Sequence, residues 1–181
     1  MRKRSTLACG AVILIGLAAC SSSPPTDSRP LGSATAPPVE CGLISSQAIG
    51  RAIGLSDFYA SGSTSASDFS HCVVSKSPSI ADKALMTIEL HDPYPSVLQS
   101  LENGKARDGG VALPDGVGPG YSAPVKDTNG NLVGGKAFAW TPDGGKMLAI
   151  QIIKGAAGRD HQADAVEFAR QLRPLLLAPA P

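Results

Sequence analysis

The sequence predicts an α+β domain, a twisted antiparallel sheet of about four to five strands with helices packed on one face, in the order αββαβββα. Three observations lead to this expectation. Apolar and polar residues alternate over 85–91 and 146–154, as in strands with one buried face. Asn129-Gly130 is a strong hairpin signal between two further strand segments. Apolar residues with helical spacing occur before, between and after these segments.

Residues 44–54 form the first predicted helix. Ser45 is suited to cap its N-terminus, and Ile44 can pack on Ile49 across the cap. Gly54 suits the left-handed position that ends many helices. The apolar positions fall on one face, so this helix should pack against the sheet.

Two strands are expected after a serine-rich loop over residues 60–70. The first covers 71–75 and the second covers 85–91. Alternation in the second strand predicts an antiparallel sheet with one solvent-exposed face. Its inward side chains are Met86, Ile88 and Leu90, and its outward side chains are Thr87, Glu89 and His91.

A second helix should begin at Pro93 and Pro95, because proline is favoured in the first turn. Gly104 is expected to end it. Its apolar stripe consists of Tyr94, Val97, Leu98 and Leu101. The following stretch, 108–124, is rich in Gly and Pro and predicts an ordered loop leading into a strand.

The remaining strands are expected at 121–126, 132–141 and 146–154, with Leu148, Ile150 and Ile152 buried in the last of them. Asp143-Gly144-Gly145 predicts the turn between the last two. A final helix is expected from about Asp160 to Arg173. Acidic residues near its start and basic residues near its end match the helix dipole, and Pro174 is expected to stop it.

The N-terminus has the order of an export signal. Arg2-Lys3-Arg4 precedes an apolar run, which ends in Leu17-Ala18-Ala19-Cys20. The run is too short for a stable span, which needs about 20 residues, but it suits a secretory signal. Small residues followed by cysteine match a bacterial lipobox. We therefore expect a signal peptide over 1–19 and lipidation of Cys20, which would hold the protein on the extracytoplasmic face of the cell membrane. The alternative is an ordinary secreted protein with a chance cysteine.

The composition divides the rest of the chain. Residues 20–40 are rich in Ser, Pro and Thr, so we expect the lipidated cysteine to be followed by a flexible tether without fixed contacts. A single globular α+β domain is expected over 41–176, with a tail over 177–181. Two or three acyl chains on Cys20 would make a stable anchor, whereas one chain would bind only marginally.

The four cysteines have separate expected roles. Cys9 lies in the signal peptide, and Cys20 is the predicted lipid site. Cys41 and Cys72 remain as an even pair in an exported domain, where a disulfide is the default. The other reading makes Cys72 a catalytic thiolate beside His71, which would require a free thiol in an oxidising compartment.

Charge argues against a nucleic-acid partner. The chain has 16 basic and 15 acidic residues. Removing the three basic residues of the signal from 16 leaves 13, so the mature chain is slightly acidic, without the basic excess that nucleic-acid binding needs.

No motif predicts catalytic residues, a cofactor or a metal. Residues 116–120 resemble a phosphate loop in composition, but Pro119 interrupts them and a strand follows, so a structural turn is favoured. His71, His91 and His161 lack the spacing of metal ligands. No Gly-x-Ser-x-Gly elbow is present. Phe138 and Trp140 share a strand face, and core packing is favoured over a ligand platform.

Several of these features occur together in one family. They are the lipobox, the Ser/Pro/Thr segment, Cys-Gly-Leu-Ile-Ser at 41–45, Ile53-Gly54, His71-Cys72-Val73, and the Gly-rich stretch 113–118 before Tyr121. In these features the chain resembles small actinobacterial cell-envelope lipoproteins of the LprB and LprC type. The resemblance implies a domain of unknown function that begins with a cysteine before a capped helix and carries a second cysteine on the next strand.

The sequence as a whole leads to three functional hypotheses. The first is a lipid-anchored, non-enzymatic envelope protein whose domain binds a small molecule, a lipid or an envelope protein. The second is a structural or assembly factor that acts through protein contacts. The third, an envelope hydrolase, would need a cleft in which Ser, His and Asp side chains converge.

Overall fold

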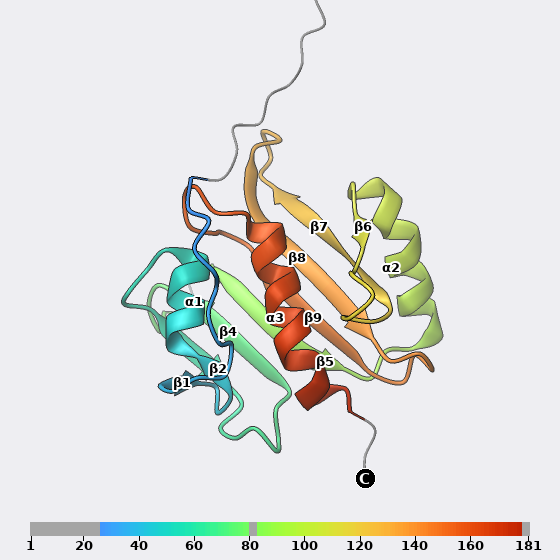
Figure 1. Ribbon diagram of the computed structural model, residues 1–181, viewed down its shortest axis with the longest axis horizontal. Coiled ribbons are helices and arrows are strands. Elements are labelled where there is room, and N and C mark those ends of the chain that lie inside the picture. Colours follow the sequence, from blue (N-terminus) through green and yellow to red (C-terminus); the bar gives the residue numbers. More distant parts are fainter. Residues whose placement is uncertain (1–25, 80–82, 179–181) are drawn as a thin grey trace, which may run out of the picture.

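The computed structural model describes residues 26–79 and 83–178 as a mixed α+β fold (Figure 1). Its elements in chain order are β1 (Val39–Glu40), β2 (Ile44–Ser45), α1 (Ser46–Ile53), β3 (Tyr59–Gly62), β4 (His71–Ser75), β5 (Met86–His91), α2 (Pro95–Arg107), β6 (Val111–Ala112), β7 (Gly120–Lys126), β8 (Leu132–Trp140), β9 (Met147–Ile152) and α3 (His161–Leu176).

The main sheet has seven strands in the order β3-β4-β5-β9-β8-β7-β6, and all neighbours are antiparallel. The α+β class and the antiparallel sheet are confirmed. The predicted count of four to five strands and the order αββαβββα are wrong, because β3, β6 and the separate β1-β2 pair were not foreseen. These elements have only two to four residues and lie at sheet edges or outside the main sheet, so no alternation identifies them.

Strand β9 joins the two halves of the sheet. Its Ile150 pairs with Ile88 of β5 on one side and with Ala137 of β8 on the other. All three side chains are buried in the larger core cluster, beneath α1 and α3. Figure 1 shows these two helices side by side across the same face of the sheet.

A second apolar cluster lies on the opposite sheet face. It contains Tyr121, Phe138 and Ala149, which are register partners across β7, β8 and β9. Leu98 and Leu101 of α2 pack against it. The prediction that all helices cover one face is therefore wrong: α2 covers the other face, because large apolar side chains there also need to be removed from water.

The helix starts agree with the sequence, whereas two helix ends do not. The Ser45 hydroxyl accepts from the Ala48 N–H at 3.5 Å, and Asp160 accepts from Ala163 at 2.9 Å. Gly104 is buried inside α2 and does not end it, because the helix continues to Arg107. Pro174 lies inside the last turn of α3, which continues to Leu176.

The prediction of a tether without fixed contacts is wrong for residues 27–40. Leu31 and Ala34 are buried in the larger core cluster. The Ala34 N–H donates to Gln171 of α3 at 2.7 Å, and the Ala34 carbonyl accepts from Ser45 at 2.7 Å. The folded body therefore includes residues 27–40 and does not begin at Cys41. Residues 20–25 of the predicted tether lie outside the described residues.

The predicted tail also contributes to the core. Leu177 is buried, and its N–H donates to the Arg173 carbonyl at 2.8 Å. Residues 179–181 lie outside the described part of the chain.

Candidate functional site

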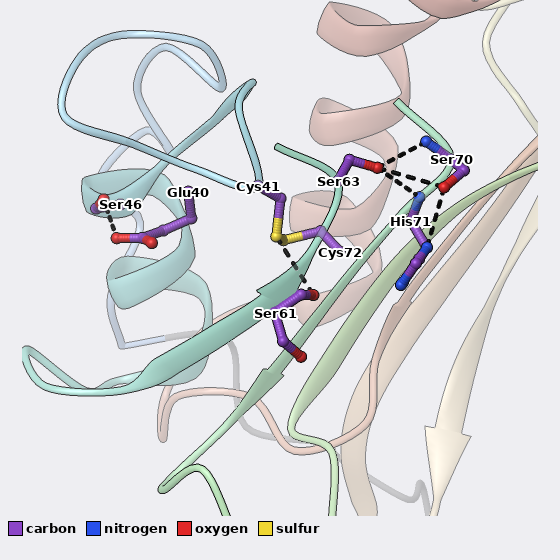
Figure 2. The surroundings of a disulfide bond; sticks show 8 residues. All are labelled: Glu40, Cys41, Ser46, Ser61, Ser63, Ser70, His71 and Cys72. Atoms are coloured by element: carbon purple, nitrogen blue, oxygen red, sulfur yellow. Dashed lines mark hydrogen bonds between the residues drawn. A yellow bond between two sulfur atoms is a disulfide. The ribbon is translucent and has the colours of Figure 1, made fainter. Parts of the chain in front are cut away.

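The disulfide between Cys41 and Cys72 is confirmed, with Cα atoms 5.6 Å apart. Cys72 is fully buried on β4, and Cys41 follows β1 with a positive φ of 50°. Figure 2 shows the bond crossing beside Ser61 of β3. The Cys41 sulfur lies 3.5 Å from the Ser61 carbonyl oxygen, which is a packing contact because a disulfide sulfur carries no proton. The bond fixes the N-terminal segment to the sheet, and no thiol is left at Cys72 for catalysis.

A serine and a histidine meet beside the disulfide (Figure 2). The Ser70 hydroxyl lies 3.0 Å from His71 Nδ1, and both residues are exposed. The Ser63 hydroxyl accepts from the backbone N–H of Ser70 at 2.8 Å and of His71 at 3.2 Å. The nearby carboxylate of Asp68 accepts from Ser65 instead. These bonds connect the end of β3 to the start of β4, which is a structural role.

A buried ion cluster lies at the start of α3. The Arg159 guanidinium donates twice to Asp164, at 2.8 and 2.6 Å, and only 4% and 7% of the two side chains are exposed. Arg159 also contacts the Asp27 carboxylate at 3.4 Å and donates to the Arg29 carbonyl at 3.0 Å. The bond with Asp164 raises the pKa of Arg159, and the bonds from Arg29, with Arg159 nearby, hold the pKa of Asp27 well below its usual range. This cluster fixes the N-terminal segment onto α3 through satisfied charges.

A hollow of about 640 Å³ lies at the opposite end of α3, within the usual size range of ligand pockets. It lies between the β8–β9 turn and the C-terminal end of the helix, and we call it the Arg173 cleft. Its lining combines two cations with apolar surface. The lining residues are Thr141, Pro142, Asp143, Gly145, Lys146, Arg173, Pro174, Leu177 and Ala178.

Arg173 is the unpaired charge of this cleft. Its Nε is buried and has no hydrogen-bond partner, and no carboxylate among the described residues forms an ion pair with it. The guanidinium lies against Gly118, whose φ is +92°, and a Cβ there would come within 2.8 Å of Arg173 Cζ. The Gly-rich stretch 116–120 is thus a turn that leads into β7, and Gly118 makes room for the arginine.

The other polar groups of the cleft are already engaged. Hydrogen bonds from the Thr141 hydroxyl and the Gly145 N–H hold the pKa of Asp143 below its usual range. Lys146 Nζ contacts the exposed Asp92 carboxylate at 3.4 Å. Asp143 is therefore ionised and oriented toward its own turn, and Arg173 is left with donors to offer a ligand.

The three histidines occupy separate elements. His71 begins β4, and His91 ends β5, where it bonds Glu89 at 2.9 Å as a surface pair. His161 begins α3, and burial lowers its pKa. Within residues 26–79 and 83–178, no group of three His, Cys, Asp or Glu is placed to hold a metal ion. Phe138 and Trp140 belong to the second apolar cluster, as the core-packing interpretation predicts.

Sequence reasoning did not find Arg159 or the cleft role of Arg173. Arg173 was assigned only a favourable place at the end of a helix, and its unpaired state depends on the turn at 116–120 and on the β8–β9 turn. Arg159 follows a glycine and precedes the capping Asp160, and its i, i+5 spacing to Asp164 matches no specific motif. Both assignments depend on segments that are distant in the chain.

Together these features define a single α+β domain with a seven-stranded antiparallel sheet and a cationic cleft at one end. No family model, curated protein or solved structure matches the chain. Within the described ranges, the helices are too short or too polar to cross a bilayer. Cys20 and the predicted signal peptide lie outside those ranges.

Proposed function

We propose that the protein is a lipid-anchored, non-enzymatic component of the cell envelope whose extracytoplasmic domain binds an anionic ligand in the Arg173 cleft. The anchor is supported by the order of Arg2-Lys3-Arg4, the apolar run and Cys20. The location is also supported by the resemblance to actinobacterial envelope lipoproteins. The disulfide of the domain suits an oxidising compartment outside the cytoplasm.

The observation that carries the binding role is the Arg173 guanidinium, which lines an open hollow and forms no ion pair with a carboxylate among the described residues. A cation without a counter-charge attracts an anion, and a hydrogen bond from a charged group is stronger than one between neutral groups. Guanidinium groups match carboxylate and phosphate oxygens in a two-point geometry. The cleft therefore favours a ligand with a carboxylate or phosphate group.

The rest of the lining defines the other part of the ligand. Pro142, Pro174 and Leu177 give the cleft an apolar wall beside the cations. A ligand with a short apolar group next to its anion would bury surface on this wall. The positive charges of Arg173 and Lys146 attract an anion into the cleft, which supports a binding role.

Arg173→Gln is expected to weaken binding of octanoate by about ten- to a hundredfold, because a hydrogen bond to a charged group contributes about 1.5–3 kcal/mol. Isothermal titration of the mature chain carrying Cys20→Ala, with sodium octanoate as the probe, measures the effect. Octanol, which has a similar chain and no charge, should bind weakly to both proteins.

Arg170→Gln is the matched control for this experiment. Arg170 lies on the same helix, is exposed and is already paired with Glu167 at 2.6 Å, so octanoate binding should not change. Equal affinity of the parent chain and Arg173→Gln for octanoate would remove the cleft as an anion site.

A second candidate function, an assembly factor that works through protein contacts, is favoured by the exposed start of α2. Tyr94 is 78% and Val97 39% exposed, although both belong to the predicted buried stripe. If this surface binds a partner, a photo-crosslinking residue at Tyr94 should capture one reproducible protein in cells, whereas the same probe at exposed Lys126 should not. Identical products at both positions would count against an assembly role.

A further inference from the structure

One end of the domain is defined by strand register and by the entry of the chain. Successive register pairs bring five strand ends together at this end of the sheet. They are the start of β3, the end of β4, the start of β5, the end of β9 and the start of β8. The loop after β9 holds the chain entry, because the Asp27 N–H donates to the Gly158 carbonyl at 2.8 Å. We call this the Asp27 end. The Arg173 cleft lies at the C-terminal end of α3, which we call the distal end. Figure 1 shows that α3 runs across the sheet from the Asp27 end to this distal end.

Because residues 27–40 belong to the folded domain, the chain between the predicted lipid site and the domain is short. The six residues 21–26 separate Cys20 from Asp27. Seven Cα–Cα steps reach at most roughly 25 Å. Helix α3, whose 16 residues run from the Asp27 end toward the cleft, is itself about 24 Å long. The distal end could therefore touch the membrane only if these residues were stretched to their limit.

Exposed side chains at the Asp27 end fit a lipid surface. Leu132, the first residue of β8, is 59% exposed, and Ile153, which directly follows the neighbouring strand β9, is 38% exposed. Lys126, the register partner of Leu132, and Lys154, which follows Ile153, are exposed as well. Apolar side chains flanked by lysines are typical of surfaces that contact anionic headgroups.

The two ends of the domain also differ in charge, and this difference favours the Asp27 end as the one that faces the membrane. The basic side chains Arg51, Lys76, Lys126 and Lys154 at the Asp27 end are all exposed. The carboxylates of Asp127 and Asp160 at this end accept from backbone N–H groups of their own turns, and Asp57 is exposed. The distal end carries Asp68, Asp92, Asp115 and Asp143 beside Lys146 and Arg173. Anionic lipid would thus attract the Asp27 end more strongly than the distal end.

We propose that the Asp27 end lies on the anionic surface of the membrane, with Leu132, Ile153 and their neighbouring lysines among the headgroups, so that the Arg173 cleft opens away from the bilayer. This inference rests on the lipid anchor of the proposed function. It adds an orientation: the cleft faces the space beyond the membrane, where a soluble anionic ligand would arrive.

The test uses the mature, lipidated chain in vesicles. With Cys20 acylated and Cys41 bonded to Cys72, an introduced cysteine is the free thiol for a fluorescent label. Leu132→Cys probes the Asp27 end, and Tyr94→Cys is the matched exposed control near the distal end. Headgroup-quencher lipids in vesicles containing phosphatidylglycerol should reduce emission from position 132 and leave position 94 unchanged. Adding Lys126→Glu and Lys154→Glu should reduce the quenching at 132.

The outcomes separate the orientation from the anchor. Mass spectrometry of the Cys20 peptide first establishes acylation, and its absence overturns the anchor and the orientation together. Acylated protein with equal quenching at both positions overturns the orientation alone. Stronger quenching at 94 would instead place the α2 surface on the lipid. Quenching at 132 that is the same in neutral phosphatidylcholine vesicles would contradict the role of the lysines.

Discussion

Asp164→Ala is expected to lower the free energy of unfolding by about 3–5 kcal/mol, among the largest effects of any single substitution in this domain. Asp164 accepts both short hydrogen bonds from Arg159, and its removal leaves a buried guanidinium without its main partner. Arg159 also holds Asp27 and the Arg29 carbonyl, so the N-terminal segment should loosen at the same time. Urea unfolding measures the stability, and limited proteolysis measures cleavage within residues 27–34.

Two variants act as controls for this prediction. The double variant Arg159→Met with Asp164→Leu removes both charges and should recover part of the loss, because an uncompensated charge causes most of the cost. Arg170→Ala breaks the surface pair with Glu167 about one and a half turns from Asp164 and should cost at most about 0.5 kcal/mol. If Asp164→Ala and Arg170→Ala unfolded at the same urea concentration, the buried cluster would not be a main source of stability.

Replacing both Cys41 and Cys72 by alanine is expected to cost about 3–4 kcal/mol, since the bond closes a long loop and restricts the unfolded chain. The two cysteines are 31 residues apart in sequence. Alanine is chosen because Cys72 is fully buried and a serine hydroxyl there would add its own desolvation cost. Urea unfolding with and without dithiothreitol measures the effect.

The reductant supplies the internal control for the disulfide. It should lower the stability of the parent chain to nearly that of the double variant and leave the double variant unchanged. A parent chain whose unfolding midpoint did not respond to a reductant, with thiol titration confirming reduction, would show that the bond adds little to the fold.

The alternation of apolar residues and the capping residues predicted the main strands and the helix starts, because each of these signals lies within a few residues of chain. Alternation places Ile88 and Ile150 on buried faces, and Ser45 and Asp160 cap helices through bonds only three residues long. The pairing of Ile88 with Ile150 has no local signal, since 61 intervening residues separate them and the choice among partners is made by the whole sheet. The same holds for α2, whose face was set by Tyr121 and Phe138 on distant strands.

Composition was misleading for residues 27–40. A segment rich in Ser, Pro and Thr has little to bury, and flexibility is the usual result. Here Leu31 and Ala34 fill a space between α1 and α3, and side chains from Gln171 and Arg159 satisfy its backbone. Contacts from 130 to 139 residues away stabilise this segment, so no property of the segment itself indicates that it is ordered.

The sequence by itself determined the α+β class, the chief strands, the helix caps and the cysteine pair. Each of these depends on short-range periodicity, on capping chemistry or on the number of cysteines left in the domain. Only the tertiary structure decided that residues 27–40 belong to the folded body, that α2 covers the second sheet face, and that Arg173 has no carboxylate partner among the described residues. Burial and charge pairing depend on which distant segments meet, and that information is held by the packed fold rather than by any local pattern.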